Sequence, residues 1–114
     1  MADTQEWVMN ALEELGERKA EHLVAYDVKP MGIFTDWVVL ATATSDVHIR
    51  ALSRYLVDRL AEAGQTPRFA RRRDEPSHWV VLDYGDFVVH LFLAESRAHY
   101  HLEALYKSCA SITR

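Results

Sequence analysis

The chain has 114 residues, of which 49% are apolar and 26% charged, and its formal net charge is −4. This balance is typical of a single globular domain, here residues 1–114, with one core of modest size. The negative net charge disfavours nucleic-acid binding through a broad positive surface.

The start of the chain carries neither a basic segment nor an apolar one, and no later run is long enough to span a bilayer. We therefore expect a cytoplasmic protein without a membrane anchor. Cys109 is the only cysteine, which excludes an internal disulfide and a zinc site built from several thiolates. Its neighbours predict a small apolar side chain that fills space on a helix.

The first predicted elements are an amphipathic helix and a short strand. Residues 4–18 place apolar side chains at helical spacing. Asp3 and Glu6 are arranged as a capping box at the start of this helix. Residues 22–28 predict a strand that ends before a turn containing proline and glycine.

A second strand and the longest helix follow. Residues 36–43 form an apolar run without alternation, which is typical of a strand buried on both faces. Ser45 then precedes a helical apolar stripe that ends at Gly64. A further short strand at 66–70 completes a βαβ crossover.

Residues 79–92 predict a β-hairpin, because two runs rich in valine, leucine and phenylalanine flank a turn that contains a glycine. We expect Tyr84 and Gly85 to form a two-residue loop. The pairs expected from that loop are Asp83 with Asp86, Val81 with Val88 and Trp79 with His90.

Both faces of this hairpin are apolar for most of their length, so we expect each face to be covered. Asp83 and Asp86 admit two interpretations. They could share a proton or hold a metal ion. The favoured interpretation is that they form the turn, since aspartate side chains accept hydrogen bonds from nearby backbone amides.

The last predicted element is a helix with an apolar stripe formed by Ala98, Leu102, Leu105 and Cys109. The predicted order is therefore α, β, β, α, β, β, β, α. A mixed β-sheet of about five strands flanked by helices buries these surfaces most simply, which makes the fold class α/β or α+β.

Three groups of polar residues are candidate sites. Ser45, Asp46 and His48 could suggest catalysis, but they are better explained by capping of the following helix. The six histidines show no metal-ligand spacing on a helix, so no metal is predicted, and His90 is expected to be a hydrogen-bonded core residue.

The arginines Arg68, Arg71, Arg72 and Arg73 could grip ribosomal RNA, but acidic residues follow them immediately. A solvated charged loop with at most minor RNA contact is the favoured interpretation.

The stretch "WVVLDYGDFVVHLFLAESRAHYHLEALY" closely resembles the hallmark of the ribosomal silencing factor family, also called Iojap. That pattern is a tryptophan, Asp-x-x-Asp, Val-His, then Arg-x-x-Tyr-x-Leu-Glu-x-Leu and an aromatic residue. The segment "TDWVVLATATSDVHIRALSRYLVDRL" is similar to the upstream part of the family. Two departures are Asp74-Glu75-Pro76, where Glu-Gly is usual, and Tyr106, where tryptophan is usual.

The resemblance implies a factor that binds the large ribosomal subunit through ribosomal protein L-fourteen. It implies that the factor blocks joining of the small subunit when nutrients are scarce. It also implies a nucleotidyltransferase-like fold without catalysis or cofactor. The partner is then expected to contact a large rigid anchor at Trp79, the two aspartates and Tyr84 at the hairpin tip. The predicted partner-binding residues are Trp79, Asp83, Tyr84, Asp86, His90, Arg97 and Tyr100.

Two alternatives stay open at this point. One is a nucleotidyltransferase-like, nucleotide-binding protein, against which the missing catalytic motif counts. The other is a small structural α/β protein that dimerises through a sheet edge. For the silencing factor, we expect a monomer or a weak homodimer.

Overall fold

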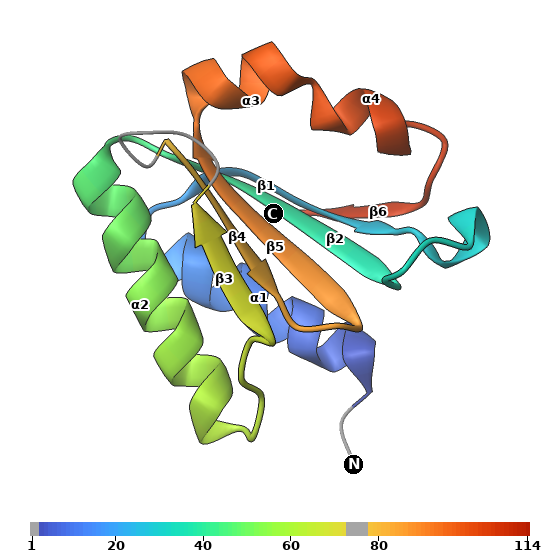
Figure 1. The fold of residues 1–114 in the computed structure, drawn as a ribbon, viewed down its shortest axis with the longest axis horizontal. Coiled ribbons are helices and arrows are strands. Elements are labelled where there is room, and N and C mark those ends of the chain that lie inside the picture. Colours follow the sequence, from blue (N-terminus) through green and yellow to red (C-terminus); the bar gives the residue numbers. More distant parts are fainter. Residues whose placement is uncertain (1–2, 73–77) are drawn as a thin grey trace.

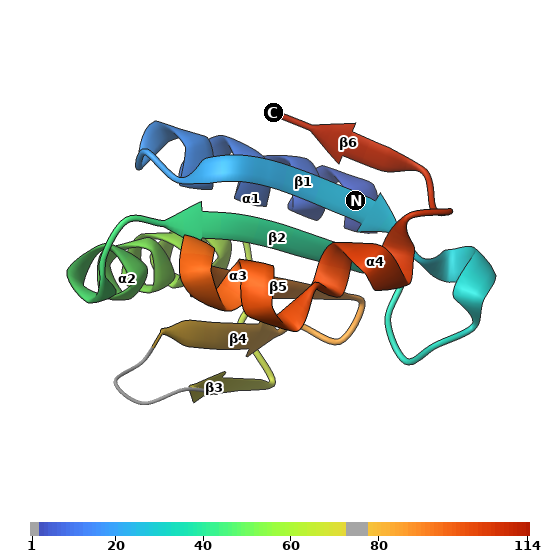
Figure 2. The same ribbon diagram turned by 90° about the horizontal axis from the view of Figure 1, so that it is seen from above.

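The structure is a computed structural model that describes residues 3–72 and 78–114. A six-stranded mixed sheet, with strand order β3-β4-β5-β2-β1-β6, lies between two helical layers. Helices α1 and α2 cover one face, and α3 and α4 cover the other (Figures 1 and 2). The prediction of a mixed sheet flanked by helices is confirmed, with one more strand than expected.

Helices α1 (Thr4–Glu17) and α2 (Asp46–Glu62) begin at the predicted caps. The carboxylate of Asp3 accepts a hydrogen bond from the Glu6 amide at 3.0 Å, and the Ser45 hydroxyl accepts one from the His48 amide at 3.1 Å. These bonds satisfy amides that have no partner inside the helix. The interpretation of Ser45 as the N-cap, with Asp46 in the first turn, is confirmed.

The centre of the sheet is β2 (Trp37–Ala43), which is buried along its whole length, as its unbroken apolar run predicts. It pairs with β1 (Glu21–Asp27) in antiparallel fashion and with β5 (Phe87–Leu93) in parallel fashion. A short 3-10 helix, η1 (Lys29–Met31), lies in the connection from β1 to β2.

The other half of the sheet contains β3 (Phe69–Arg72) and β4 (Trp79–Asp83). The strand predicted at 66–70 therefore lies further along the chain. Strand β3 includes Arg71 and Arg72, which were expected to lie in a charged loop. Arg73, Asp74, Glu75 and Pro76 lie outside the described residues, as do the side chains of Arg71 and Arg72.

The hairpin of β4 and β5 has a different register from the predicted one. Trp79 pairs with Phe92, and Asp83 pairs with Val88. The Tyr84 amide donates to the Phe87 carbonyl at 2.9 Å, so the two loop residues are Gly85 and Asp86. Only Gly85 of these two has a positive φ, which is the pattern of a type II′ turn. All three expected pairs are wrong: Asp83 with Asp86, Val81 with Val88 and Trp79 with His90.

The C-terminal segment is a pair of short helices followed by a strand. Helix α3 (Ala94–Tyr100) ends at His101, which has a φ of 51°, and α4 (Leu102–Tyr106) begins there. Strand β6 (Ser111–Thr113) then pairs with β1 at the edge of the sheet. The continuous last helix was wrong, because Leu105 is exposed and Cys109 lies beyond α4, partly buried against the core.

Each face of the sheet has its own apolar cluster. The larger cluster joins α1 and α2 to one face, and it includes Leu82, Phe87 and Leu91 of the hairpin. The smaller cluster lies under α3 and α4 and includes Trp79, Phe92 and Tyr106. The prediction that both faces of the hairpin are covered is confirmed.

Candidate docking surface

Trp79 lies under α3, where only 7% of its surface is exposed. Its ring packs on Tyr100, with 4.6 Å between ring centroids, and on Phe92, with 5.8 Å between centroids. Its indole Nε1 donates a hydrogen bond to Nδ1 of His90 at 3.0 Å. Helix α3 covers the ring, so the side chain that the sequence predicts as the anchor is buried in this structure.

Tyr84 also points inward, and only 5% of it is exposed. Its ring stacks on Phe87 at an interplanar angle of 7°, and burial raises the pKa of Tyr84 to about 12. With Gly85 and Asp86 as the loop, Tyr84 takes a strand position on the face that α1 and α2 cover. The prediction that Tyr84 reaches across from the hairpin tip is wrong.

Asp83 and Asp86 differ in their roles. A carboxylate oxygen of Asp83 accepts a hydrogen bond from the Gly85 amide at 2.8 Å, which confirms Asp83 as a turn former. Asp86 is exposed in the loop. Among residues 3–72 and 78–114, no group of three histidine, cysteine or acidic side chains could hold a metal ion.

Arg97 ties the helical cover to the sheet. Its NH1 donates to the His22 carbonyl at 2.7 Å and to the Thr42 hydroxyl at 2.9 Å, while its Nε pairs with Glu103. Burial alone would raise the pKa of the Glu103 carboxyl, but its bond with Arg97 holds that pKa below the usual value. The Arg97 side chain is 12% exposed, so it holds α3 and α4 in place rather than offering a charge to a partner.

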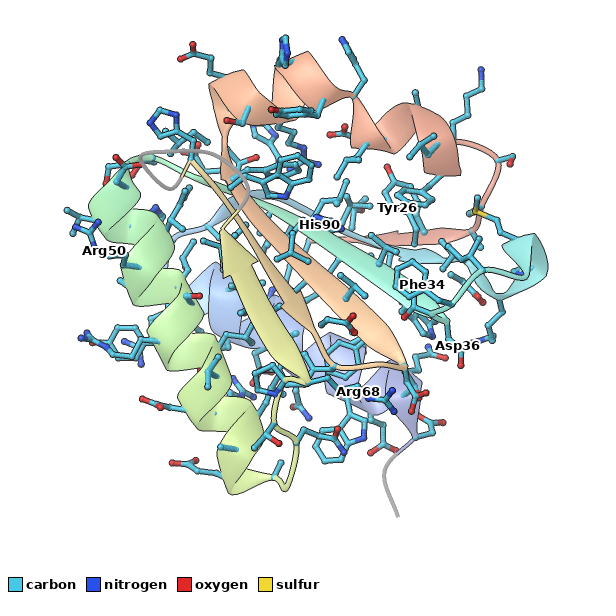
Figure 3. The ribbon with its side chains drawn as sticks, in the orientation of Figure 1. Tyr26, Phe34, Asp36, Arg50, Arg68 and His90 are labelled. Carbon is cyan, nitrogen blue, oxygen red and sulfur yellow. The ribbon has the colours of Figure 1, made fainter. Side chains whose placement is uncertain are left out.

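His90 and Tyr100 lie close to Trp79 but are more accessible. His90 is partly buried at the centre of β5, and Figure 3 shows it on the face that carries Tyr26. Tyr100 is the last residue of α3 and is exposed. Of the predicted site residues, the structure brings Trp79, His90 and Tyr100 together as one cluster, whereas the two aspartates lie at the end of the hairpin.

Three acidic residues gather at that end of the sheet. Asp27 ends β1, Asp36 precedes β2 and Asp86 precedes β5. The amides of Asp36 and Trp37 both donate to the Asp86 carbonyl, at 3.0 and 3.3 Å, and Asp27 pairs with Trp37. These backbone contacts place the three aspartates at the same end of the sheet, which we call the acidic end (Figure 3 labels Asp36).

Two cations partly balance this acidic end. The Lys29 ammonium lies 3.5 Å from the Asp27 carboxylate. The Arg68 guanidinium lies against Gly85, where an added Cβ would be 2.7 Å from Nε of Arg68. The end of the sheet thus carries three carboxylates, Asp27, Asp36 and Asp86, beside Lys29 and Arg68, and its charge is acidic on balance.

Phe34 is an exposed aromatic residue that the sequence analysis does not identify. It lies in the connection between β1 and β2, directly before the acidic end, and it is 78% exposed (Figure 3). Met31 and Ile33 of the same connection are exposed as well. The sequence does contain an indication of this exposed apolar group. Three large apolar residues stand in a turn segment with Pro30 and Gly32, where polar residues are more usual.

No helix among the described residues is long and apolar enough to cross a membrane. The fold and the site together define a small α+β domain with one mixed sheet between two helical layers and an acidic sheet end. The sequence model described as "Ribosomal silencing factor during starvation" matches residues 1–114, and the chain belongs to this family.

Individual relatives agree with this assignment. The chain is 31% identical over 90 residues to "Ribosomal silencing factor RsfS" of Bacillus subtilis, which covers 79% of this chain and 75% of that protein. It is 30% identical over 94 residues to "Mitochondrial assembly of ribosomal large subunit protein 1" of Mus musculus, covering 81% of this chain and 41% of that one. A crystal structure of a Chromobacterium violaceum protein superposes with a TM-score of 0.87 at 29% identity, covering 93% of this chain and 88% of that one.

Proposed function

We propose that the chain binds the large ribosomal subunit through ribosomal protein L-fourteen and blocks association with the small subunit, which represses translation when nutrients are limiting. The observation that carries this proposal is membership of the silencing factor family along the whole chain. The name of the mouse relative, which refers to assembly of the large subunit, supports the choice of that subunit.

The proposed action is steric and needs no catalytic residue. The domain measures 35 × 33 × 24 Å along its principal axes. A stable interface buries ~800 Å² on each partner, which is roughly an eighth of the 6398 Å² accessible surface of this chain. A domain of this size, bound where the subunits meet, excludes the second subunit by occupying its place.

The predicted partner-binding residues divide by accessibility. Asp86 and Tyr100 are exposed, and Asp83 and His90 are partly accessible, so we propose that these four contact the partner directly. Trp79 and Tyr84 are buried, and Arg97 is bonded to Glu103, Thr42 and the His22 carbonyl. We propose that these three residues hold the contacting residues in position. Carboxylates at the sheet end suit lysine and arginine side chains of a ribosomal protein.

The test is cosedimentation of the purified protein with separated ribosomal subunits. We expect it to travel with free large subunits and not with small ones, and to lower the yield of joined ribosomes when both are mixed. Equal binding to both subunits, or binding only to intact ribosomes, contradicts the proposal. The cytoplasmic location stays a prediction, since one relative is named as mitochondrial.

A further inference from the structure

The connection from β1 to β2 holds Phe34 outward on a fixed backbone. The Val28 amide donates to the Asp36 carbonyl at 2.9 Å, which closes the two ends of the connection. Inside it, η1 and the left-handed Gly32, with a φ of 66°, set the path of the chain. Thr35, directly after Phe34, is buried with only 3% of its surface exposed. The exposed ring is therefore presented by an ordered loop rather than by a free terminus.

Isolated exposed apolar residues are common on protein surfaces. Phe34 differs because exposed Met31 and Ile33 share its loop, and because α4, with its exposed Leu105, lies toward the same end of the molecule (Figures 1 and 2). Binding hot spots are typically aromatic side chains at the centre of an interface with a polar rim. A preformed loop also loses little conformational entropy on binding.

The charges around Phe34 select the kind of partner. The acidic end of the sheet supplies Asp27, Asp36 and Asp86. Of the two cations there, Lys29 is paired with Asp27 and Arg68 lies against Gly85, so the carboxylates are in excess. Carboxylates repel the phosphates of RNA. In a two-fold dimer through this surface, each acidic end would meet its own copy, which like charges oppose. A protein surface rich in lysine and arginine complements it.

We propose that Phe34 is the apolar centre of the docking surface, with Asp36 and Asp86 as its acidic rim, and that its occupant is a basic protein surface with an apolar pocket. This inference rests on the proposed function and deepens it. The aromatic anchor that the sequence analysis placed at Trp79 is supplied by Phe34 instead.

The test measures dissociation constants of the labelled full chain for purified bacterial large subunits by fluorescence anisotropy. Phe34→Ala should weaken binding about tenfold or more, because it removes the central apolar contact. Phe34→Leu should recover part of the affinity. The matched control is Val47→Ala, since Val47 is 66% exposed at the start of α2, beyond the opposite end of β2, and this variant should bind like the parent.

Charge is tested with Asp86→Lys, which should weaken binding more than Asp86→Asn, most clearly at low salt. Melting temperatures are measured for every variant. Because Phe34 and Asp86 are exposed, we expect their variants to melt like the parent. A variant that melts like the parent reports on binding alone.

The outcomes separate this inference from the proposed function. If the parent binds large subunits and Phe34→Ala binds equally well, the inference is overturned and the proposed function stands. If the parent does not bind large subunits, both fail. Two further results overturn the choice of occupant: equally tight, Phe34-dependent binding to protein-free large-subunit RNA, or a Phe34-dependent dimer in analytical ultracentrifugation.

Discussion

The indole of Trp79 donates a hydrogen bond to Nδ1 of His90, at 3.0 Å, across the β4–β5 hairpin. Trp79 lies opposite Phe92 and His90 lies opposite Val81, so this bond runs diagonally between the strands. An Nδ1 that accepts a hydrogen bond leaves the proton of the neutral ring on Nε2. Trp79 therefore fixes the tautomer and orientation of His90.

The first prediction concerns Trp79. Trp79→Ala should lower the free energy of unfolding by ~3–5 kcal/mol, because it empties a buried site between β4 and α3. Trp79→Phe keeps most of the packing but removes the bond to His90, and should cost ~1–2 kcal/mol. Urea unfolding followed by circular dichroism measures both changes.

Binding to large subunits distinguishes a structural Trp79 from a contacting one. Folded Trp79→Phe should keep nearly parental affinity, since the indole offers little surface to a partner. If Trp79→Ala unfolds like the parent yet loses binding, Trp79 contacts the partner directly and the structural role is wrong.

The second prediction concerns the two hairpin aspartates. Asp86→Asn should weaken binding to large subunits by ~0.2–1 kcal/mol at low salt, because it removes one exposed charge from the acidic rim. Asp83→Asn should fold normally, since its amide oxygen can still accept from the Gly85 amide. The measurement is affinity at two salt concentrations, with melting curves for both variants.

Asp83→Ala serves as the control for the turn. Loss of the bond to Gly85 should destabilise the protein by ~1 kcal/mol, and loss of the charge should reduce the salt dependence of binding. Unchanged affinity of both Asp86→Asn and Asp83→Asn at low ionic strength would leave the two aspartates as turn residues only.

The hairpin shows how far periodicity reaches. Its apolar alternation placed Leu82 and Val89 on one face and Trp79 on the other, as the structure has them. The predicted loop, Tyr84 and Gly85, lies one residue before the observed loop, Gly85 and Asp86. The segment from Asp83 to Asp86 is compatible with either two-residue loop. A loop of Tyr84 and Gly85 would need a positive φ at tyrosine, whereas Gly85 and Asp86 need it only at glycine.

Other features leave no local signal in the sequence. The break between α3 and α4 falls at His101, which has a left-handed conformation although no glycine or proline marks the position in the sequence. Strand β6 has three residues, too few to show an alternation of apolar and polar side chains. It forms because its backbone pairs with the free edge of β1. The burial of Trp79 depends on where α3 settles, which is a tertiary property.

The third prediction concerns the clamp formed by Arg97. Arg97→Lys should lower the free energy of unfolding by ~1–3 kcal/mol, because a single ammonium nitrogen cannot occupy both positions from which Nε pairs with Glu103 and NH1 donates to Thr42 and the His22 carbonyl. Urea unfolding at neutral pH measures this cost. If Arg97→Lys is as stable as the parent, the clamp does not hold α3 and α4 to the sheet.

The fourth prediction concerns acid and the carboxyl of Glu103. Its pKa is lowered in the folded protein, so its contribution to stability is present above the unfolded value of ~4.3 and is lost as pH falls through the folded pKa. Glu103→Gln should therefore lose less stability than the parent between pH 6 and pH 3. Equal acid sensitivity of the two proteins, in urea unfolding at both pH values, would remove Glu103 from this role.

The last prediction concerns the buried hydroxyl of Tyr84, which makes no hydrogen bond within the described residues. Tyr84→Phe removes this group while keeping the ring stacked on Phe87, so it should leave stability unchanged or raise it by ~1 kcal/mol.

The pKa of Tyr84, raised to about 12 by burial, exceeds the unfolded value of ~10. Its contribution to stability is therefore present below pH 10 and is lost as pH rises toward 12. Urea unfolding at pH 8 and pH 10.5 should show a smaller alkaline loss in Tyr84→Phe than in the parent. Tyr26→Phe is the matched control, since that ring is only partly buried and should change the alkaline loss less. A destabilised Tyr84→Phe at pH 8 would show that the hydroxyl has a partner that stabilises the fold.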